Sequence, residues 1–243
     1  MTTQSAAKFD AARAAEYARQ SRIGLAGYDA CHELSACMVS AALGAGSNAR
    51  ILVVGAGGTA GEIITAARLE PGWTFVAVDP SPPMLELARA ALVEHGLADR
   101  VTVTLGALDD VPRAPPFDAA IMIGVLHHLP GDAAKRDVLA GLAARLKPGA
   151  PLVLAGNCRP YDSEPTLLAA WAVRWRMHGA DPDEVRAKMA KILQGAEPPR
   201  SEAEVARLLD GAGFDPPLRF FASLFWAAWM TRRAGAQTPP AAA

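Results

Sequence analysis

Short apolar segments alternate with helical patterns between residues 50 and 156, and this alternation constrains the fold more than any other feature. The apolar segments are residues 51–54, 75–78, 101–104, 119–123 and 152–154. Residues 81–96 and 132–146 between them place apolar side chains at helical spacing. Strand and helix in alternation imply right-handed crossovers, so the pattern predicts a parallel sheet with helices on both faces.

Composition limits the size and the partners of such a fold. The chain has 243 residues, of which 51% are apolar, enough for one domain with a substantial core. A formal net charge of −1 provides no global field for nucleic acid or an anionic membrane. Cys31, Cys37 and Cys158 are odd in number and lack the spacing of metal ligands, so we expect neither a disulfide framework nor a metal site.

The N-terminal segment carries Lys8, Asp10 and Arg13 where a signal peptide would need its apolar stretch. No apolar run in the sequence approaches the length that spans a bilayer. We therefore expect a cytoplasmic protein with no membrane association.

The sequence outside the alternating region predicts helical additions around one domain, residues 1–243. Helical patterns lie around 165–178 and 182–193, and a capping box at Ser201 opens a further helix before two apolar segments at 218–221 and 225–230. The predicted parts are an N-terminal helical cap (1–45), a cofactor-binding core (46–156), a helical insert (157–199), a final helix and strand pair (200–232) and a flexible tail (233–243).

A glycine-rich loop, residues 55–61, follows the first strand and opens a helix. Glycines let a ligand approach the backbone, and the N–H groups of a helix start favour an anionic group. Asp79 ends the next strand, 24 positions after Gly55, where a carboxylate can accept the hydroxyls of an adenosine ribose. The pair predicts a nucleotide-type cofactor. Because Gly55, Gly57 and Ala60 also satisfy the dinucleotide fingerprint, this loop alone leaves an NAD(P) enzyme as a competitor.

The order of motifs along the chain decides against NAD(P). Residues 53–57, 78–85, 117–120, 125–129 and 146–149 together resemble the class I S-adenosylmethionine (SAM)-dependent methyltransferases. The resemblance covers about residues 50–156, and no Tyr-x-x-x-Lys pair supports a short-chain reductase.

The resemblance implies a fold, a cofactor and a set of cofactor contacts. The fold is a doubly wound, Rossmann-like α/β sheet of seven mostly parallel strands, the last antiparallel, with the N-terminal helices and the insert as a cap. The cofactor is SAM and the product S-adenosylhomocysteine. The contacts carried over by position are Tyr28, Gly55, Ala56, Gly57, Asp79, Pro80, Met84, Ala107, Leu108, Ile123 and Gly124.

In this assignment Asp79 holds the ribose, Met84 packs on the adenine, and Ile123 and Gly124 border the methionine portion. The chain departs from the family at two of its positions. Thr59 stands where the third loop glycine is usual, and the next glycine along the chain is Gly61. Ala107 stands where an acidic residue is common, and Asp109 or Asp110 is the alternative partner for the adenine amine.

A narrower resemblance extends to the carboxy-S-adenosylmethionine synthase branch, in which a tyrosine like Tyr28 closes over the cofactor. That synthase holds its extra carboxylate with an Asn and an Arg. Ile123 and Ala190 occupy the matching positions here, so ordinary methyl transfer is favoured over carboxymethyl cofactor synthesis.

Candidate residues for the chemistry follow the fourth and fifth strands. His127 or His128 could act as a general base, because imidazole titrates near neutrality; the alternative is packing beside the cofactor. Substrate contacts are predicted at Asn157, Arg159, Tyr161, Trp171, Arg174 and Trp175. Trp171, Arg174 and Trp175 share one helix face, for which core packing is the alternative.

The sequence therefore predicts an enzyme that methylates an oxygen or nitrogen atom of a small molecule. Two alternatives stay open: a tRNA-modification enzyme, either methyltransferase or carboxy-SAM synthase-like, and a non-catalytic cofactor-binding protein. The balanced charge disfavours a nucleic-acid substrate. A homodimer through aromatic residues near the last strand is a further open possibility.

Overall fold

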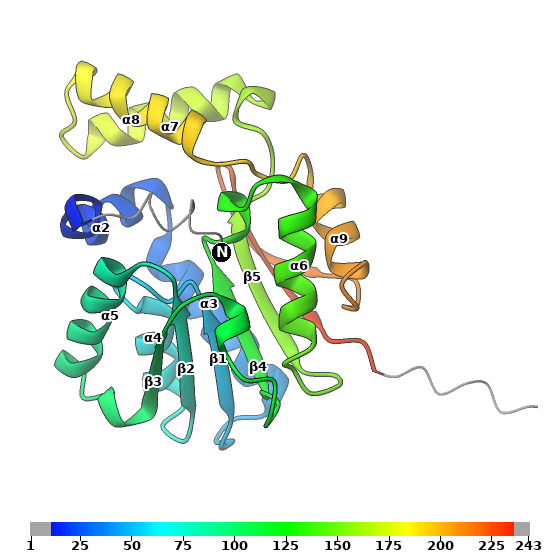
Figure 1. Ribbon diagram of the computed structural model, residues 1–243. Helices are drawn as coiled ribbons and strands as arrows, with labels where there is room; N and C mark the ends of the chain where they lie inside the picture. The colour runs from blue at the N-terminus through cyan, green and yellow to red at the C-terminus, as the bar shows by residue number, and fades with distance from the viewer. Residues whose placement is uncertain (1–10, 236–243) are drawn as a thin grey trace, which may run out of the picture.

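Seven strands form one sheet in the computed structural model, which describes residues 11–235 (Figure 1). The strands are β1 (Arg50–Val54), β2 (Thr74–Asp79), β3 (Val101–Leu105), β4 (Ala119–Ile123), β5 (Pro151–Asn157), β6 (Leu218–Ser223) and β7 (Trp226–Arg232). Their spatial order is β3-β2-β1-β4-β5-β7-β6. The strands β1 to β5 pair in parallel, and β7 is antiparallel to both neighbours. The predicted fold class is confirmed.

Helices cover both faces of this sheet and one of its ends. They are α2 (Ala11–Gly24), α3 (Tyr28–Leu43), α4 (Gly61–Leu69), α5 (Pro82–Glu94), α6 (Gly131–Ala143), α7 (Pro165–Met177), α8 (Pro182–Gly195) and α9 (Glu202–Asp210). Short 3-10 turns occupy Ala98–Arg100, Leu108–Asp110, Leu126–His128 and Tyr161–Ser163. Among the helices described here, none is long and apolar enough to cross a membrane.

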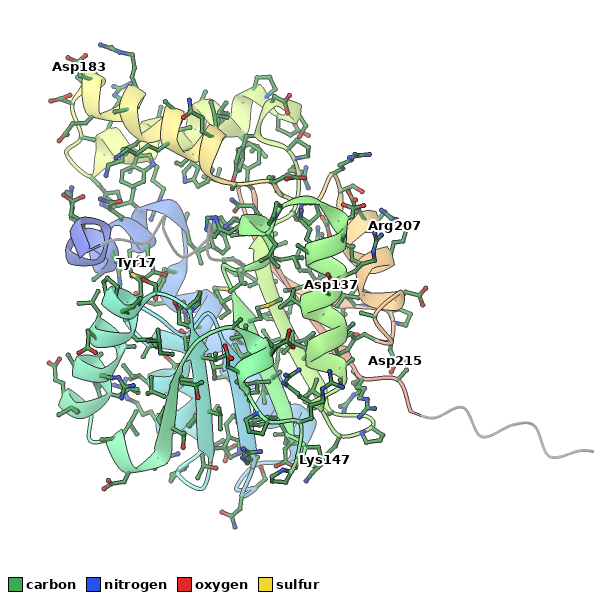
Figure 2. All side chains as sticks on the ribbon, in the orientation of Figure 1. Tyr17, Asp137, Lys147, Asp183, Arg207 and Asp215 are labelled. Atoms are coloured by element: carbon green, nitrogen blue, oxygen red, sulfur yellow. The ribbon has the colours of Figure 1, made fainter. Side chains whose placement is uncertain are left out.

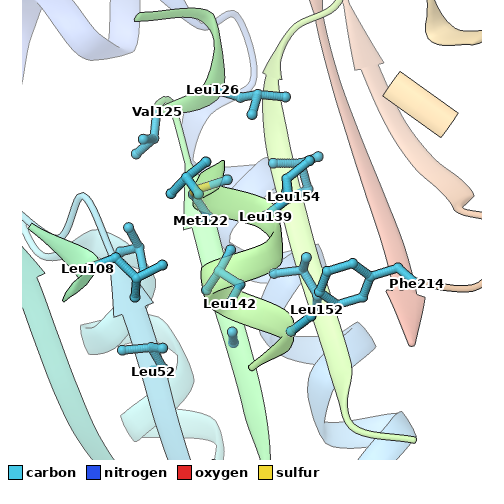
Figure 3. Close-up of a cluster of buried hydrophobic side chains, with 14 of the residues drawn as sticks. Leu52, Leu108, Met122, Val125, Leu126, Leu139, Leu142, Leu152, Leu154 and Phe214 are labelled. Atoms are coloured by element: carbon cyan, nitrogen blue, oxygen red, sulfur yellow. The ribbon is translucent and has the colours of Figure 1, made fainter. Parts of the chain in front are cut away.

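The central strands are buried on both faces, as their continuous apolar sequence predicts. Because successive side chains point to opposite faces, Leu52 and Val54 join a cluster beneath α6 and α9, whereas Ile51 and Val53 join a cluster beneath α3, α4 and α5. Figure 3 shows the first cluster, with Leu139 of α6 lying across the strands. The two packed faces make the sheet a rigid platform for the loops at its ends.

The helices α2, α7 and α8 form a cap above the carboxyl ends of the parallel strands (Figure 1). Hydrogen bonds join α7 to the end of α2, far away in the sequence. The indole Nε1 of Trp171 donates to the carbonyl of Gly24 at 2.9 Å, and Arg174 Nε donates to the carbonyl of Ile23 at 2.9 Å. These contacts tie the N-terminal helix to the insert.

The described residues modify the predicted ends of the chain. Arg233, assigned to the tail from sequence, donates its backbone N–H to Ala150 at 2.9 Å and accepts one from Gly149 at 2.9 Å. The ordered chain therefore continues past residue 232. The rest of the predicted tail, 236–243, and the first ten residues of the predicted cap, 1–10, lie outside the described residues.

Candidate functional site

A cavity of about 740 Å³ opens at the carboxyl ends of β1, β4 and β5, under the cap. Eleven of the residues predicted from sequence line it: Tyr28, Gly55, Gly57, Ile123, Gly124, His127, His128, Asn157, Tyr161, Trp171 and Trp175. They come from the glycine loop, the ends of two strands and one insert helix. The fold thus brings residues over 140 positions apart in the sequence into one lining.

The glycine loop is too tightly packed for side chains at its first two glycines. A Cβ on Gly55, whose φ is +76°, would lie 2.2 Å from Cγ2 of Val125. A Cβ on Gly57 would lie 2.6 Å from Cβ of Met84 and 2.8 Å from Oδ2 of Asp79. Real Cβ atoms do not approach so closely, so both positions require glycine, and both line the cavity with bare backbone.

Asp79 holds this loop in place from the end of β2. Its Oδ2 accepts the backbone N–H of Gly57 at 3.1 Å, and its Oδ1 accepts that of Ser81 at 2.9 Å. Burial raises the pKa of Asp79, and the two backbone hydrogen bonds work against that rise. A buried carboxylate beside bare loop backbone matches the group expected to bind ribose hydroxyls.

Tyr28 and Thr59 connect α3 with the glycine loop. The Tyr28 hydroxyl and Thr59 Oγ1 lie 2.7 Å apart, so the threonine that replaces a glycine has a defined partner. Burial and then the charge of Glu62 raise the pKa of Tyr28 to about 12. Tyr28 is therefore a neutral phenol at physiological pH.

His32 and Glu62, which the sequence reading missed, also line the cavity. His32 Nε2 lies 3.6 Å from Glu62 Oε2, and both side chains are buried. Burial lowers the pKa of His32, but the interaction with the Glu62 carboxylate outweighs it, and the pKa is raised. The four-residue spacing of Tyr28 and His32 on one helix face was the available signal for His32.

The two histidines after β4 have different hydrogen-bond partners. His127 is buried, and its Nδ1 accepts the backbone N–H of Asn157 at 3.3 Å. His128 is part-buried, and its Nδ1 donates to the carbonyl of Gly195 at 3.3 Å. In the neutral rings, His127 therefore carries its proton on Nε2, whereas His128 has an unprotonated Nε2.

Aromatic side chains and buried polar atoms form the wall of the cavity beneath the cap. Asn157 Nδ2 donates to the Tyr161 hydroxyl at 2.6 Å. Asn157 Oδ1 is buried, as are the indole nitrogens of Trp175 and Trp226, and within the described part of the chain these atoms have no hydrogen-bond partner. Buried polar atoms are normally satisfied, so this end of the cavity offers one acceptor and two donors to a bound molecule.

Two of the predicted substrate contacts lie outside the lining and have other partners. Arg159 pairs with Glu164 at 3.6 Å and with Glu202 at 3.7 Å. Arg174 donates to two main-chain carbonyls of α2: Nε donates to Ile23 and Nη2 donates to Arg22, each at 2.9 Å. For Arg174 the structure shows an interhelical bond in place of a contact with the cavity.

The predicted adenine side also differs in part from expectation. The Leu108 side chain is buried in the core cluster of Figure 3, and Asp110 Oδ2 accepts the backbone N–H of Ala107 at 2.8 Å. Asp109 is instead 3.5 Å from Arg145. Neither alternative acidic residue is therefore without a partner. Pro80 is half-buried, Met84 is buried and Ala56 is fully buried.

Tyr17 of α2 covers the glycine loop from above. A Cβ on Gly58 would lie 2.3 Å from Cε1 of Tyr17 and 3.1 Å from Cε of Met84. Figure 2 shows Tyr17 between α2 and α5, and Tyr17 also lines the cavity. The helix assigned to the cap from sequence thus reaches the glycine loop, which no local motif indicated.

The described residues contain no group of three or more His, Cys, Asp or Glu side chains able to hold a metal ion. What the site offers is a bare loop, a buried carboxylate, a histidine pair and an aromatic wall. This donor set fits an adenosine-containing cofactor at one end and an organic molecule at the other.

Comparison with known proteins finds similarity over the central part of the chain. Residues 52–152 match a family described as "Methyltransferase domain". A curated relative, the ubiquinone biosynthesis O-methyltransferase of Xylella fastidiosa (strain 9a5c), is 33% identical over 111 residues, 45% of this chain and 42% of that protein. The match therefore spans less than half of the curated relative's length.

Solved structures extend the likeness to most of the chain. An O-methyltransferase family protein of Burkholderia thailandensis has 18% identity and a TM-score of 0.58, covering 90% of this chain and 64% of that chain. Human N-acetylserotonin methyltransferase, solved in complex with SAM, has 17% identity and a TM-score of 0.57, covering 84% and 52%. At these identities the likeness establishes the fold alone. The narrower resemblance to carboxy-SAM synthases is not confirmed.

Proposed function

We propose that this chain belongs to the class I SAM-dependent methyltransferase family and transfers a methyl group from SAM to an oxygen or nitrogen atom of a small organic molecule. One observation carries the proposal: a single cavity joins the glycine loop to the aromatic wall beneath the cap. A methyl donor and an acceptor must meet in line, and a shared cavity with two chemically different ends supports that arrangement.

The cofactor end fits SAM by the packing of its loop and the place of its carboxylate. Gly55 and Gly57 would contribute bare backbone, and Asp79 would hold the ribose hydroxyls. When bound, SAM supplies a methyl group on a positively charged sulfur, which is already an activated leaving group. The residues of this chain then have to align the acceptor and exclude water.

The acceptor end favours a flat organic molecule with a few polar groups. Trp171 and Trp226 contribute aromatic surface to the lining, and Asn157 Oδ1 would accept a hydrogen bond from a bound hydroxyl or amine. Residues of α2, α7 and α8 line the cavity, which supports the proposed role of these helices in selecting the substrate.

Two cations of the cap have carboxylate partners and therefore give little support to the tRNA alternative. Lys188 lies 3.5 Å from Glu16, and Arg186 pairs with Asp183 at the outer end of α8 (Figure 2). A phosphate-binding surface needs cations that are not already neutralised by carboxylates. We therefore keep the small-molecule acceptor as the proposal, in a protein that we expect to be cytoplasmic.

The tautomers of the two histidines favour His128 as the general base. His128 has an unprotonated Nε2 when neutral, which is the form that takes a proton from an acceptor hydroxyl or ammonium. The Nδ1 of His127 already accepts a backbone N–H, so its Nε2 bears hydrogen and would donate to a ligand instead. We assign His127 to positioning.

Calorimetry with SAM followed by transfer of a radiolabelled methyl group tests the proposal. We expect the purified chain to bind SAM and to label at least one member of a panel of phenols, carboxylic acids and amines. Failure to bind SAM at high micromolar concentration would overturn the proposal. Binding without labelling of any small molecule, with labelling of bulk tRNA, would favour the alternative substrate.

Histidine variants test the assignment of the base. For a hydroxyl acceptor, His128→Gln should lower kcat by roughly 100-fold or more, the usual contribution of a general base, and leave the affinity for SAM unchanged. His127→Gln should affect kcat less and raise KM more, because it disturbs the bond to Asn157. Equal losses of kcat in both variants would contradict the assignment.

A further inference from the structure

Glu62 places a buried carboxylate in the wall of the cavity beside the glycine loop. It lies in the first turn of α4, is only 9% exposed, and shares the lining with Gly55 and Gly57. No residue motif in the sequence pointed to it. A carboxylate at such a site requires hydrogen-bond donors or a cation to offset its loss of water.

The partner that the chain itself provides for Glu62 is incomplete. Nδ1 of His32 lies 2.8 Å from the Tyr28 carbonyl, so it carries the ring's proton when His32 is neutral. Nε2, the atom 3.6 Å from the Glu62 carboxylate, is then an acceptor facing an acceptor. His32 satisfies Glu62 only when the ring is protonated, and no other ion pair to Glu62 is present in the described residues.

Asp79, the other carboxylate beside the loop, is in a different situation. It accepts two backbone N–H groups, whereas no backbone N–H of the described residues donates to Glu62. The two negative charges also act on each other, because Glu62 contributes to the raised pKa of Asp79. A cationic group entering the cavity beside Glu62 would relieve both effects.

We propose that Glu62 binds the α-ammonium group in the methionine portion of SAM, an inference that rests on the proposed function. The ammonium group has three N–H donors and a full charge, which is what a buried carboxylate lacking donors requires. The sulfonium has no N–H to donate, and its methyl group must face the acceptor near Asn157 and Trp226. His32, packed behind Glu62, positions the carboxylate.

Ligands that differ in one charged group make the assignment testable by calorimetry. S-adenosylhomocysteine keeps the ammonium but lacks the sulfonium charge, and 5′-methylthioadenosine lacks the amino acid portion altogether. Glu62→Gln preserves side-chain size, so we expect affinity for SAM and for S-adenosylhomocysteine to fall together by roughly 30-fold or more. Affinity for 5′-methylthioadenosine should change less than about 2-fold.

A matched variant controls for the loss of charge. Glu94→Gln removes the same group from an exposed position on α5, and all three affinities should stay within about 2-fold of the wild type. Thermal unfolding without ligand establishes that both variants fold.

Each other outcome overturns the inference in a distinct way. Unchanged SAM affinity in Glu62→Gln removes Glu62 from the cofactor site, and a loss for SAM alone assigns it to the sulfonium. A loss for all three ligands means general damage to the loop. A wild-type chain that binds none of them contradicts the proposed function itself, before any variant is compared.

Discussion

The two ends of the cavity are built from different kinds of chemical group. At the end that we propose for the cofactor, the backbone and strand termini within residues 55–79 form the site, and glycines are required because neighbouring atoms leave no room for a Cβ. At the end that we propose for the acceptor, side chains from α2, α7, α8 and the end of β5 form the wall. One end depends on a local loop, the other on helices brought together by the fold.

This difference separates what each end tolerates. A binding site made of glycine backbone loses affinity when a single methyl group is added, because the packed strands beneath it do not move to make room. A wall of side chains on helices accepts substitutions that change which molecule fits, because each side chain can be exchanged without moving the sheet. The contrast predicts that cofactor binding and acceptor choice can be damaged independently.

The largest loss of SAM affinity is expected from a substitution at Gly57. In Gly57→Ala the added methyl group collides with Cβ of Met84 and Oδ2 of Asp79, so SAM affinity should fall roughly 100-fold or more. Gly24→Ala is the matched control at the cap, because a Cβ there meets no atom within 4 Å. Calorimetry measures the SAM affinity of both variants. An equal loss of affinity in Gly24→Ala and Gly57→Ala would contradict the difference between the two ends.

A smaller loss, confined to the acceptor, is expected from a substitution at Asn157. Asn157→Leu removes a buried, unpaired polar atom of a residue that lines the cavity, so kcat/KM for the acceptor should fall roughly 10- to 30-fold. The affinity for SAM should stay within about 2-fold of the wild type, since the loop is untouched. Tyr161→Phe, which keeps Asn157, is the control and should cost less. A parallel loss of SAM affinity would show that the two ends are not independent.

The smallest effect is expected from two buried tyrosines, one near each end. Burial raises the pKa of both Tyr28 and Tyr161 from 10.0 to about 12. The folded state therefore holds these protons more tightly than the unfolded state. Their stabilising contribution is complete below pH 10 and is lost between pH 10 and pH 12, about 1.4 kcal/mol per tyrosine by pH 11.

Urea unfolding of the wild type between pH 9 and pH 11.5 measures this loss, and Tyr28→Phe or Tyr161→Phe should each reduce it. A pH dependence that is the same in both variants as in the wild type would mean that neither tyrosine is responsible.

The sequence signals for the glycine-loop end of the cavity are local. A glycine loop after an apolar strand, with an aspartate ending the next strand, requires no knowledge of distant residues, and Gly57 and Asp79 indeed lie in contact. The strand pattern also predicted the parallel part of the sheet, since burial on both faces demands continuous apolar segments.

Only the tertiary structure decided the rest. Arg174 shares a helix face with Trp171, and helical spacing alone could not tell a ligand contact from the carbonyls of Ile23 and Arg22 that it binds. His127 and His128 are adjacent in sequence, but their tautomers depend on Asn157 and Gly195, which the fold brings to them.

Glu62 illustrates the same limit. It follows the glycine loop directly, but its role depends on His32, on the burial of the pair and on the cavity they share. Local backbone conformation and hydrophobic periodicity depend on residues that are close together in the sequence. The sequence by itself therefore determined the sheet and its loop. Burial, charge and hydrogen-bond partners arise between distant residues, and therefore only the folded chain decided which side chains can act.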